Sequence, residues 1–249
     1  MNEPRTREAP GLPTVDVNEY GGKKDGVQQA MNRRLFMQLL VFDAPGDGTR
    51  EANALADLLH GRGIPGVVYA DTSNPRGVGL LTWSEDPAHF VERVRPLFAH
   101  DRLALVHLRQ DYTMMGRTYS IGYEPDLEHV LLRRSVENAL HPGWDWHVWY
   151  PLRRTGAFAK LDPQEQSAIL REHGALGMAY GQTDLGHDIR LACHGLDAGD
   201  NEFVIGLIGR ELHPLSHLVQ AMRKTKQTSE FIAKMGPFFV GRVLHRSAG

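Results

Sequence analysis

The sequence contains a single cysteine, Cys193, among its 249 residues. One cysteine cannot form an internal disulfide, and it excludes metal sites built from several thiolates, such as zinc fingers. Long apolar runs are also missing, since no segment approaches the roughly 18 residues that a membrane-spanning helix requires. The first residues have no apolar core of the kind found in secretory signal peptides. We therefore expect a cytoplasmic, soluble protein with no membrane partner.

Excess charge and familiar short motifs are lacking as well. The chain carries 28 Lys and Arg against 30 Asp and Glu, a formal net charge of -2. This balance gives no basic surface for nucleic acid, so we expect no nucleic-acid partner. The phosphate-binding P-loop, the dinucleotide-binding glycine motif, the zinc-protease histidine motif and the nucleophile elbow of hydrolases are all absent from the sequence.

The order of predicted elements is more informative than any motif. Residues 1–30 are rich in Pro, Gly and charge, and we expect a tail there. From residue 31 the apolar periodicity predicts strands at 35–42, 64–71, 77–83 and 103–108, with helices at 49–61 and from residue 86. The same order follows in strands at 147–152, 189–195, 202–209 and 237–243, with helices at 161–174 and from residue 213.

This repeated β-α-β-β-α-β order predicts an α+β fold class. Each copy matches the ferredoxin-like arrangement, one in residues 31–140 and one in residues 141–249. Two such halves can pack sheet against sheet as a dimeric α+β barrel. The space between a sheet and its helices would then suit a large flat ligand.

The segment ILREHGALGMAY, residues 169–180, places a histidine on the helix face that packing would bury. Ile169, His173 and Leu176 stand at i, i+4 and i+7 and therefore share that face. Such a histidine is commonly a core residue with its ring nitrogens bonded to backbone carbonyls. The alternative is an axial metal ligand whose partners come from a porphyrin, because no Cys or His/Asp/Glu cluster stands beside it. Gly174 would leave room for that macrocycle or would cap the end of the helix.

A second candidate is the aromatic strand WDWHVWYPLRR, residues 144–154. On a strand Trp144, Trp146, Val148 and Tyr150 would share one face that ends in a phenol. That face is either a core surface with a solvated basic end or a surface where the phenol meets a cofactor. In the second case the arginines that follow would pair with the carboxylates of the cofactor.

Five segments of the C-terminal half occur in a characteristic order: WYPLRR, LREHGALGMAY, GDNEFVIGL, AMRKTKQTSEF and GPFFVG. This series resembles the chlorite dismutase family, which includes chlorite dismutases, coproheme decarboxylases and haem peroxidases. The resemblance implies two ferredoxin-like halves per subunit, assembled as a homopentamer. It also implies a haem cofactor, either haem b or coproheme, with its iron coordinated by His173.

The same resemblance assigns the distal side of the cofactor. Tyr150 matches the redox-active tyrosine of coproheme decarboxylases. Arg190 becomes the distal arginine of chlorite dismutases if the segment GQTDLGHD contains extra loop residues. If it does not, the distal position is Gly186 or His187.

The remaining expected contacts surround the porphyrin. Its carboxylates are expected to pair with four arginines: Arg133, Arg134, Arg154 and Arg223. Trp149, Leu152 and Gly174 are expected to line the cofactor, with Leu152 replacing a methionine of the family motif. Gln227 stands where many relatives have a glutamate beside the proximal imidazole, and a neutral side chain there would push less electron density onto His173.

Several functions follow from these expectations. The leading one is peroxide-driven oxidative decarboxylation of coproheme to haem b, with Tyr150 as the catalytic radical. The second is chlorite dismutation to chloride and O2, with Arg190 holding the oxyanion. The fold and motifs are also compatible with a haem peroxidase, a haem carrier or sensor, and a cofactorless monooxygenase.

Overall fold

Within residues 12–249, which the computed structural model describes, eight strands form a closed barrel. The pairing runs β10–β9–β7–β3–β5–β4–β12–β8, and β8 pairs again with β10. The strands are β3 (Phe36–Asp43), β4 (Gly66–Asp71), β5 (Gly77–Ser84), β7 (Met114–Thr118), β8 (Trp146–Arg154), β9 (His187–Ala192), β10 (Phe203–Gly209) and β12 (Phe239–Ser247). Two short strands lie outside the ring, β6 (His107–Leu108) on β3 and β11 (Ile232–Met235) on β8.

The two halves of the barrel have the same topology. In the first half the spatial order is β7–β3–β5–β4, and in the second it is β9–β10–β8–β12. In both halves the first and third strands of the chain are central and the second and fourth are outer, which is the ferredoxin-like order. Antiparallel pairing of β7 with β9 and of β12 with β4 joins the halves. The predicted fold class and the duplication of pattern are confirmed.

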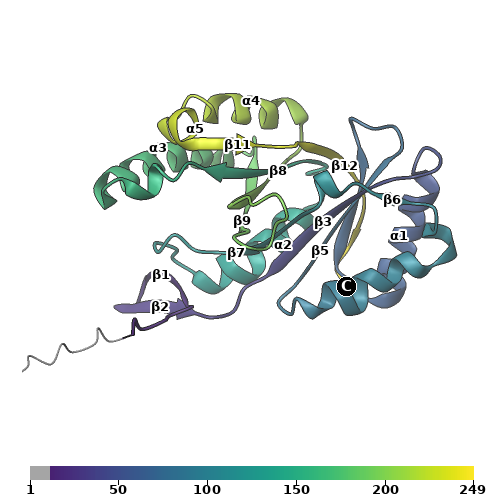
Figure 1. Cartoon of the computed structure of the whole chain (residues 1–249), viewed down its shortest axis with the longest axis horizontal. Coiled ribbons are helices and arrows are strands. Elements are labelled where there is room, and N and C mark those ends of the chain that lie inside the picture. The colour runs from purple at the N-terminus through teal and green to yellow at the C-terminus, as the bar shows by residue number, and fades with distance from the viewer. Residues whose placement is uncertain (1–11) are drawn as a thin grey trace, which may run out of the picture.

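Helices surround the barrel, and the apolar residues of the segment 132–140 pack against its interior cluster (Figure 1). The α-helices are α1 (Thr49–Arg62), α2 (Arg134–Leu140), α3 (Pro163–Gln182), α4 (Leu212–Met222) and α5 (Lys226–Phe231). Shorter 3-10 or π-helical segments are η1 (Phe90–Val94), η2 (Arg95–Ala99), η3 (Asp101–Leu103), η4 (Gln110–Tyr112), η5 (His129–Arg133) and η6 (Phe158–Lys160). In the described part of the chain, no helix has both the length and the apolar character needed to span a bilayer.

Three apolar layers result from this arrangement. The barrel interior is filled by inward side chains such as Met37, Trp149 and Phe239. Helix α1 packs its apolar stripe on the outer face of β3, β4 and β5. Helices α3 and α4 cover the outer face of β8, β9 and β10, and Figure 1 shows them with α5 on one side of the molecule, away from α1.

A buried polar pair sits inside the barrel. The Tyr69 hydroxyl lies 2.8 Å from His147 Nδ1, and His147 Nε2 lies 3.1 Å from the Trp144 carbonyl oxygen. Because that carbonyl can only accept, Nε2 carries the proton and Nδ1 accepts from Tyr69. Burial lowers the pKa of His147 to about 3, so the ring is neutral in the folded protein.

This depressed pKa predicts an acid-sensitive stability. The unfolded chain takes up a proton at His147 below about pH 6.5, whereas the folded protein does so only near pH 3. The free energy of unfolding should therefore fall by up to about 1.4 kcal/mol per pH unit between these values. Urea unfolding at pH 7, 6 and 5 measures the slope. A His147→Gln variant, which keeps both hydrogen-bonding roles, should have a flatter slope, and equal slopes would contradict the prediction.

The structure differs from the sequence-based expectation in the first half. The helix expected from residue 86 is the irregular pair η1 and η2, because Pro96 removes a backbone donor and clashes with the preceding turn. The strand expected at 103–108 is largely absent, since Leu103 lies in η3 and is buried under α1. The fourth strand of this half is instead β7, further along the chain.

The expected tail also differs over part of its length. Residues 1–11 lie outside the described residues, but β1 (Glu19–Lys24) and β2 (Val27–Met31) form a hairpin. Its turn is Asp25-Gly26, both with positive φ, which favours a tight two-residue connection. Glu19 ties the hairpin to the barrel by accepting from Arg117 at 2.8 Å.

Candidate functional site

Helix α3 carries the histidine singled out in the sequence. Asp162 caps its N-terminus by accepting from the backbone N–H groups of Gln164 and Glu165, and Pro163 occupies the first turn. Ile169 and Tyr180 are buried on the side of the helix that His173 shares. The helix continues to Gln182, so Gly174 lies in mid-helix and is not a C-cap.

His173 is held from one side by a hydroxyl. Its Nδ1 lies 3.3 Å from Thr225 Oγ1, at the residue that precedes α5. Burial lowers the pKa of His173, and the positive charge of Arg190 lowers it further against the opposing effect of Glu172 and Asp188. The imidazole is therefore neutral near pH 7, as a metal ligand must be.

Below α3 and α4 lies the outer face of β8, β9 and β10, which we call the Tyr150 face. Ile205 of β10 is directly opposite Tyr150 in the β8 pairing and directly opposite Arg190 in the β9 pairing. Because opposed residues point to the same side of a sheet, the phenol and the guanidinium belong to one row. Leu152 lies on this face, two residues along β8 from Tyr150.

Asp188 organises the charges of the Tyr150 face. It stands two residues before Arg190 on β9 and lies 2.9 Å from Arg190 Nε. Arg134 of α2 pairs with the same carboxylate, and Asn138 donates to the Asp188 carbonyl oxygen at 3.0 Å. The Arg190 charge lowers the pKa of His173 and the Asp188 charge raises it, so both groups of β9 act on the imidazole.

Tyr150 is buried against aromatic and apolar neighbours. Its ring stacks on Phe238 with centroids 4.6 Å apart, and only 5% of the residue is exposed. Burial raises the pKa of the phenol, and the Asp188 carboxylate raises it further, while Arg223 acts in the opposite direction. The phenol is therefore protonated at neutral pH. Among residues 12–249 its hydroxyl has no hydrogen-bond partner.

The arginines expected to hold carboxylates occupy different settings. Arg154 lies 3.1 Å from Glu202 and packs over the rings of Phe158 and Phe203, at 4.7 and 4.8 Å. Arg223 ends α4, is exposed, and is close enough to Tyr150 for its charge to lower the pKa of the phenol.

The adjacent arginines Arg133 and Arg134 also occupy different settings. Arg134 reaches Asp188 on the Tyr150 face, whereas Arg133 is exposed and acts on Asp126. Of this pair, only Arg134 is brought to the site.

Some expected residues lie elsewhere. Trp149 is fully buried in the barrel interior against Gly206, because successive residues of β8 alternate between the two faces. Trp144, which precedes β8, also lies in the interior layer and not beside Tyr150. The position of a Cβ on Gly174 would meet no atom within 4 Å, so this glycine leaves open space on α3.

The three distal candidates also separate. His187 stacks on Trp144 with centroids 3.7 Å apart, and its Nε2 lies 2.9 Å from Asp184. Gly186 is packed beneath Leu215 and Leu218. Arg190 lies in the same row as Tyr150, whereas Gly186 lies under α4, just before β9.

Two residues of the site were missed in the sequence. Asp188 could have been found from the pattern HDIR, because residues two apart on a strand share a face. Thr225 takes the position beside His173 that the sequence analysis gave to Gln227, whose buried Oε1 has no partner among the described residues. The only sign of Thr225 was a hydroxyl residue two positions before Gln227.

The arrangement combines one neutral imidazole, one buried phenol and a braced guanidinium around apolar side chains. Several of those side chains are only partly buried between the sheet and the helices: Leu176, Phe203, Ile205, Met222, Ile232, Met235 and Phe238. Residues 12–249 contain no group of three or more His, Cys, Asp or Glu that could hold a metal ion by themselves. The set fits a flat apolar metal complex, because His173 offers one nitrogen ligand and the surrounding surface is apolar.

The protein is a ferredoxin-like α+β barrel in which a helix-borne histidine lies above a charged sheet face. The chain belongs to the chlorite dismutase family, since the family model described as Chlorite dismutase matches residues 80–244. No curated protein is similar enough in sequence to be counted as a relative.

Solved structures share the fold. A heme-binding protein from Thermus thermophilus has a TM-score of 0.68 at 17% identity, covering 87% of this chain and 93% of that one. A tryptophan-to-phenylalanine variant of chlorite dismutase from Candidatus Nitrospira defluvii, in complex with cyanide, has a TM-score of 0.66 at 13% identity, covering 86% of this chain and 92% of that one. The imidazole complex of chlorite dismutase from the same organism has a TM-score of 0.64 at 13% identity, covering 86% and 93%.

Proposed function

We propose that this protein binds an iron porphyrin through His173 and catalyses the peroxide-driven oxidative decarboxylation of coproheme to haem b. Membership of the chlorite dismutase family and the likeness to a heme-binding protein support the cofactor. When bound, the iron supplies the oxidising equivalents of peroxide. The observation that carries the reaction is the buried, unpartnered Tyr150 phenol, within residues 12–249, on the same sheet face as Arg190.

The role of Tyr150 follows from its surroundings. A phenol whose pKa is raised by burial keeps its proton, so its oxidation must release a hydrogen atom or a proton together with an electron. The resulting phenoxyl oxygen would take a hydrogen atom from the carbon chain of a propionate. Stacking on Phe238 fixes the orientation of the ring.

The reaction balances with one peroxide for each propionate. A propionate loses CO2, two electrons and a proton and becomes a vinyl group. Hydrogen peroxide takes up the two electrons, the proton from the propionate and one further proton from solvent, and is reduced to two molecules of water. Coproheme carries four propionates and haem b two, so two such cycles are required.

Arg223 is the best-placed partner for a reacting carboxylate. It is exposed, forms no ion pair within residues 12–249, and lies close enough to Tyr150 to act on its pKa. Arg134 is already paired with Asp188, and Arg154 with Glu202. Each guanidinium would therefore have only some of its N–H donors available for a propionate.

The test is a titration of the apo protein with ferric coproheme and, separately, with haem b, followed by stoichiometric hydrogen peroxide. Absorbance reports ligation, and mass spectrometry reports the mass of the porphyrin. Two successive losses of the propionate carboxyl groups are expected, and His173→Ala should weaken porphyrin binding and change its spectrum. Tight binding of coproheme without any mass loss would indicate a carrier or sensor and would overturn the proposal.

Chlorite dismutation is the second candidate, because Arg190 lies on the Tyr150 face close to His173. If chlorite is turned over, Arg190→Gln should lower the rate by about 100-fold, the loss typical of removing one donor that stabilises a developing oxyanion. Decarboxylation should change much less. Arg153→Gln is a matched control, since Arg153 pairs with the exposed Asp200 at 2.9 Å. Equal effects of the two variants on chlorite turnover would contradict this role.

A further inference from the structure

The hydrogen bonds of Thr225 define where its single hydroxyl proton lies. Thr225 Oγ1 is 2.8 Å from the Met222 carbonyl oxygen, 3.3 Å from His173 Nδ1 and 3.4 Å from Thr228 Oγ1. A carbonyl oxygen has no proton, so two oxygens at 2.8 Å require the Thr225 proton between them. The hydroxyl therefore donates to Met222, and its lone pairs face His173 and Thr228.

That direction determines the tautomer of the imidazole. A neutral imidazole has one N–H and one bare nitrogen. Because Nδ1 faces a lone pair of Thr225 Oγ1, it can form a hydrogen bond only when it carries the proton. Nε2 then has the free electron pair, and it makes no hydrogen bond within the described part of the chain.

We propose that Thr225 is a positioning residue that holds His173 in the tautomer protonated at Nδ1 and so presents Nε2 as the ring nitrogen for iron. The iron-binding half of this statement rests on the proposed function, whereas the tautomer is a property of the apo protein.

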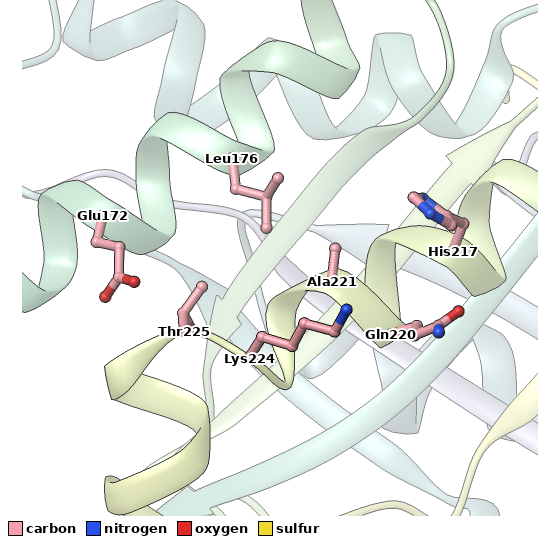
Figure 2. Close-up of a pocket in the computed structure, with 7 residues that line it drawn as sticks. All are labelled: Glu172, Leu176, His217, Gln220, Ala221, Lys224 and Thr225. Atoms are coloured by element: carbon pink, nitrogen blue, oxygen red, sulfur yellow. The ribbon is translucent and has the colours of Figure 1, made fainter.

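Thr225 also lies at a groove between α3 and α4 (Figure 2). The groove has a volume of about 370 Å³ and includes Glu172, Leu176, Lys224 and Thr225 in its lining. Figure 2 shows Thr225 between Glu172 and Lys224. Only 5% of Thr225 is exposed, so its hydroxyl is a buried partner of the imidazole and the charged side chains lie around it.

A neutral acceptor has a chemical consequence at the iron. An imidazole N–H that faces a carboxylate gains imidazolate character and donates more electron density to the metal. An imidazole N–H that faces the neutral Thr225 oxygen gains less imidazolate character and donates less electron density. We therefore expect a higher iron reduction potential here than in a Thr225→Asp variant.

The first test uses the full-length apo protein with 15N-labelled histidine, assigned by comparison with His173→Ala. Nuclear magnetic resonance should show Nδ1 protonated in the wild type and in Thr225→Ser. Thr225→Val, which keeps the shape but loses the oxygen, should shift the population toward the Nε2–H form. Gln227→Met is the matched control and should behave like the wild type, because Gln227 makes no bond to His173.

Two results would overturn the proposal: an Nε2–H tautomer in the wild type, or an unchanged tautomer in folded Thr225→Val. The wild-type spectrum decides the matter even if the valine variant does not fold.

The second test loads haem b and measures its reduction potential. Thr225→Asp should lower the potential and Thr225→Ser should leave it unchanged, and a potential indifferent to both would contradict the proposed tuning. If His173→Ala leaves the spectrum of the loaded protein unchanged, the proposed function fails. The apo tautomer then decides the role of Thr225 by itself.

Discussion

Tyr150→Phe should bind coproheme as the wild type does and lose its decarboxylation. The ring and its stacking on Phe238 remain, so the binding surface is preserved, while the hydrogen that the reaction must exchange is gone. We expect the rate to fall by about 100-fold or more, the range lost when a group that exchanges a proton with reacting atoms is removed. Mass spectrometry of the porphyrin after peroxide addition measures the loss.

A second buried phenol supplies the control for this variant. Tyr119 follows β7, and burial raises its pKa as it does for Tyr150, with Arg190 close to both the ring and the site. Its ring packs against Phe203 with centroids 5.5 Å apart. Tyr119→Phe should keep most of the turnover. If Tyr150→Phe retains decarboxylation and Tyr119→Phe loses it, the reacting phenol is Tyr119.

Trp149→Ala should cause the largest loss of stability among the variants considered. Trp149 is fully buried in the barrel interior, so truncation leaves a large cavity beside Gly206 and Phe239. The expected cost is about 3–5 kcal/mol of the free energy of unfolding, measured by equilibrium unfolding in urea. Because Trp149 points away from the Tyr150 face, the molecules that remain folded should still bind the porphyrin.

The matched control is Leu244→Ala on β12, where the side chain is 45% exposed. Its cost should stay within about 0.5 kcal/mol, as for most surface substitutions. A similar small cost for Trp149→Ala would show that the indole does not support the barrel.

Much of this architecture is predictable from apolar periodicity. The second half was predictable in every barrel strand and in both long helices, because each of these segments has a clear period and a turn or cap at its ends. The first half was less so, since Pro96 breaks the expected helix and the apolar run after Leu103 is used to cover α1 instead of forming the fourth strand. Local sequence does not report which partner a short apolar run will find.

The sequence indicates which residue types form the candidate site better than it indicates which residues contact one another there. Strand alternation groups Tyr150 with Val148 on one face of β8, but only the pairing of β8 and β9 with β10 shows that Tyr150 and Arg190 share a row. The hydrogen-bond partner of His173 is Thr225, which precedes α5 and lies 52 residues further along the chain, and no spacing rule connects the two. Trp149 differs from these cases, because strand alternation by itself places its side chain on the face opposite to Tyr150, whereas the family motif had suggested contact with the cofactor.

The two halves of the barrel also differ in how tightly their covering helices are seated. Helix α1 has five buried residues in 14, whereas α3 has only two in 20. Helix α1 is thus packed closely on its sheet, whereas most of α3 stays unburied above the Tyr150 face. If the Tyr150 face holds the porphyrin as proposed, the weakly buried α3 leaves room for it, whereas α1 covers only the protein core. Substitutions that tighten the seat of α3 should therefore gain stability at the expense of ligand capacity, while the same changes under α1 should carry no such penalty.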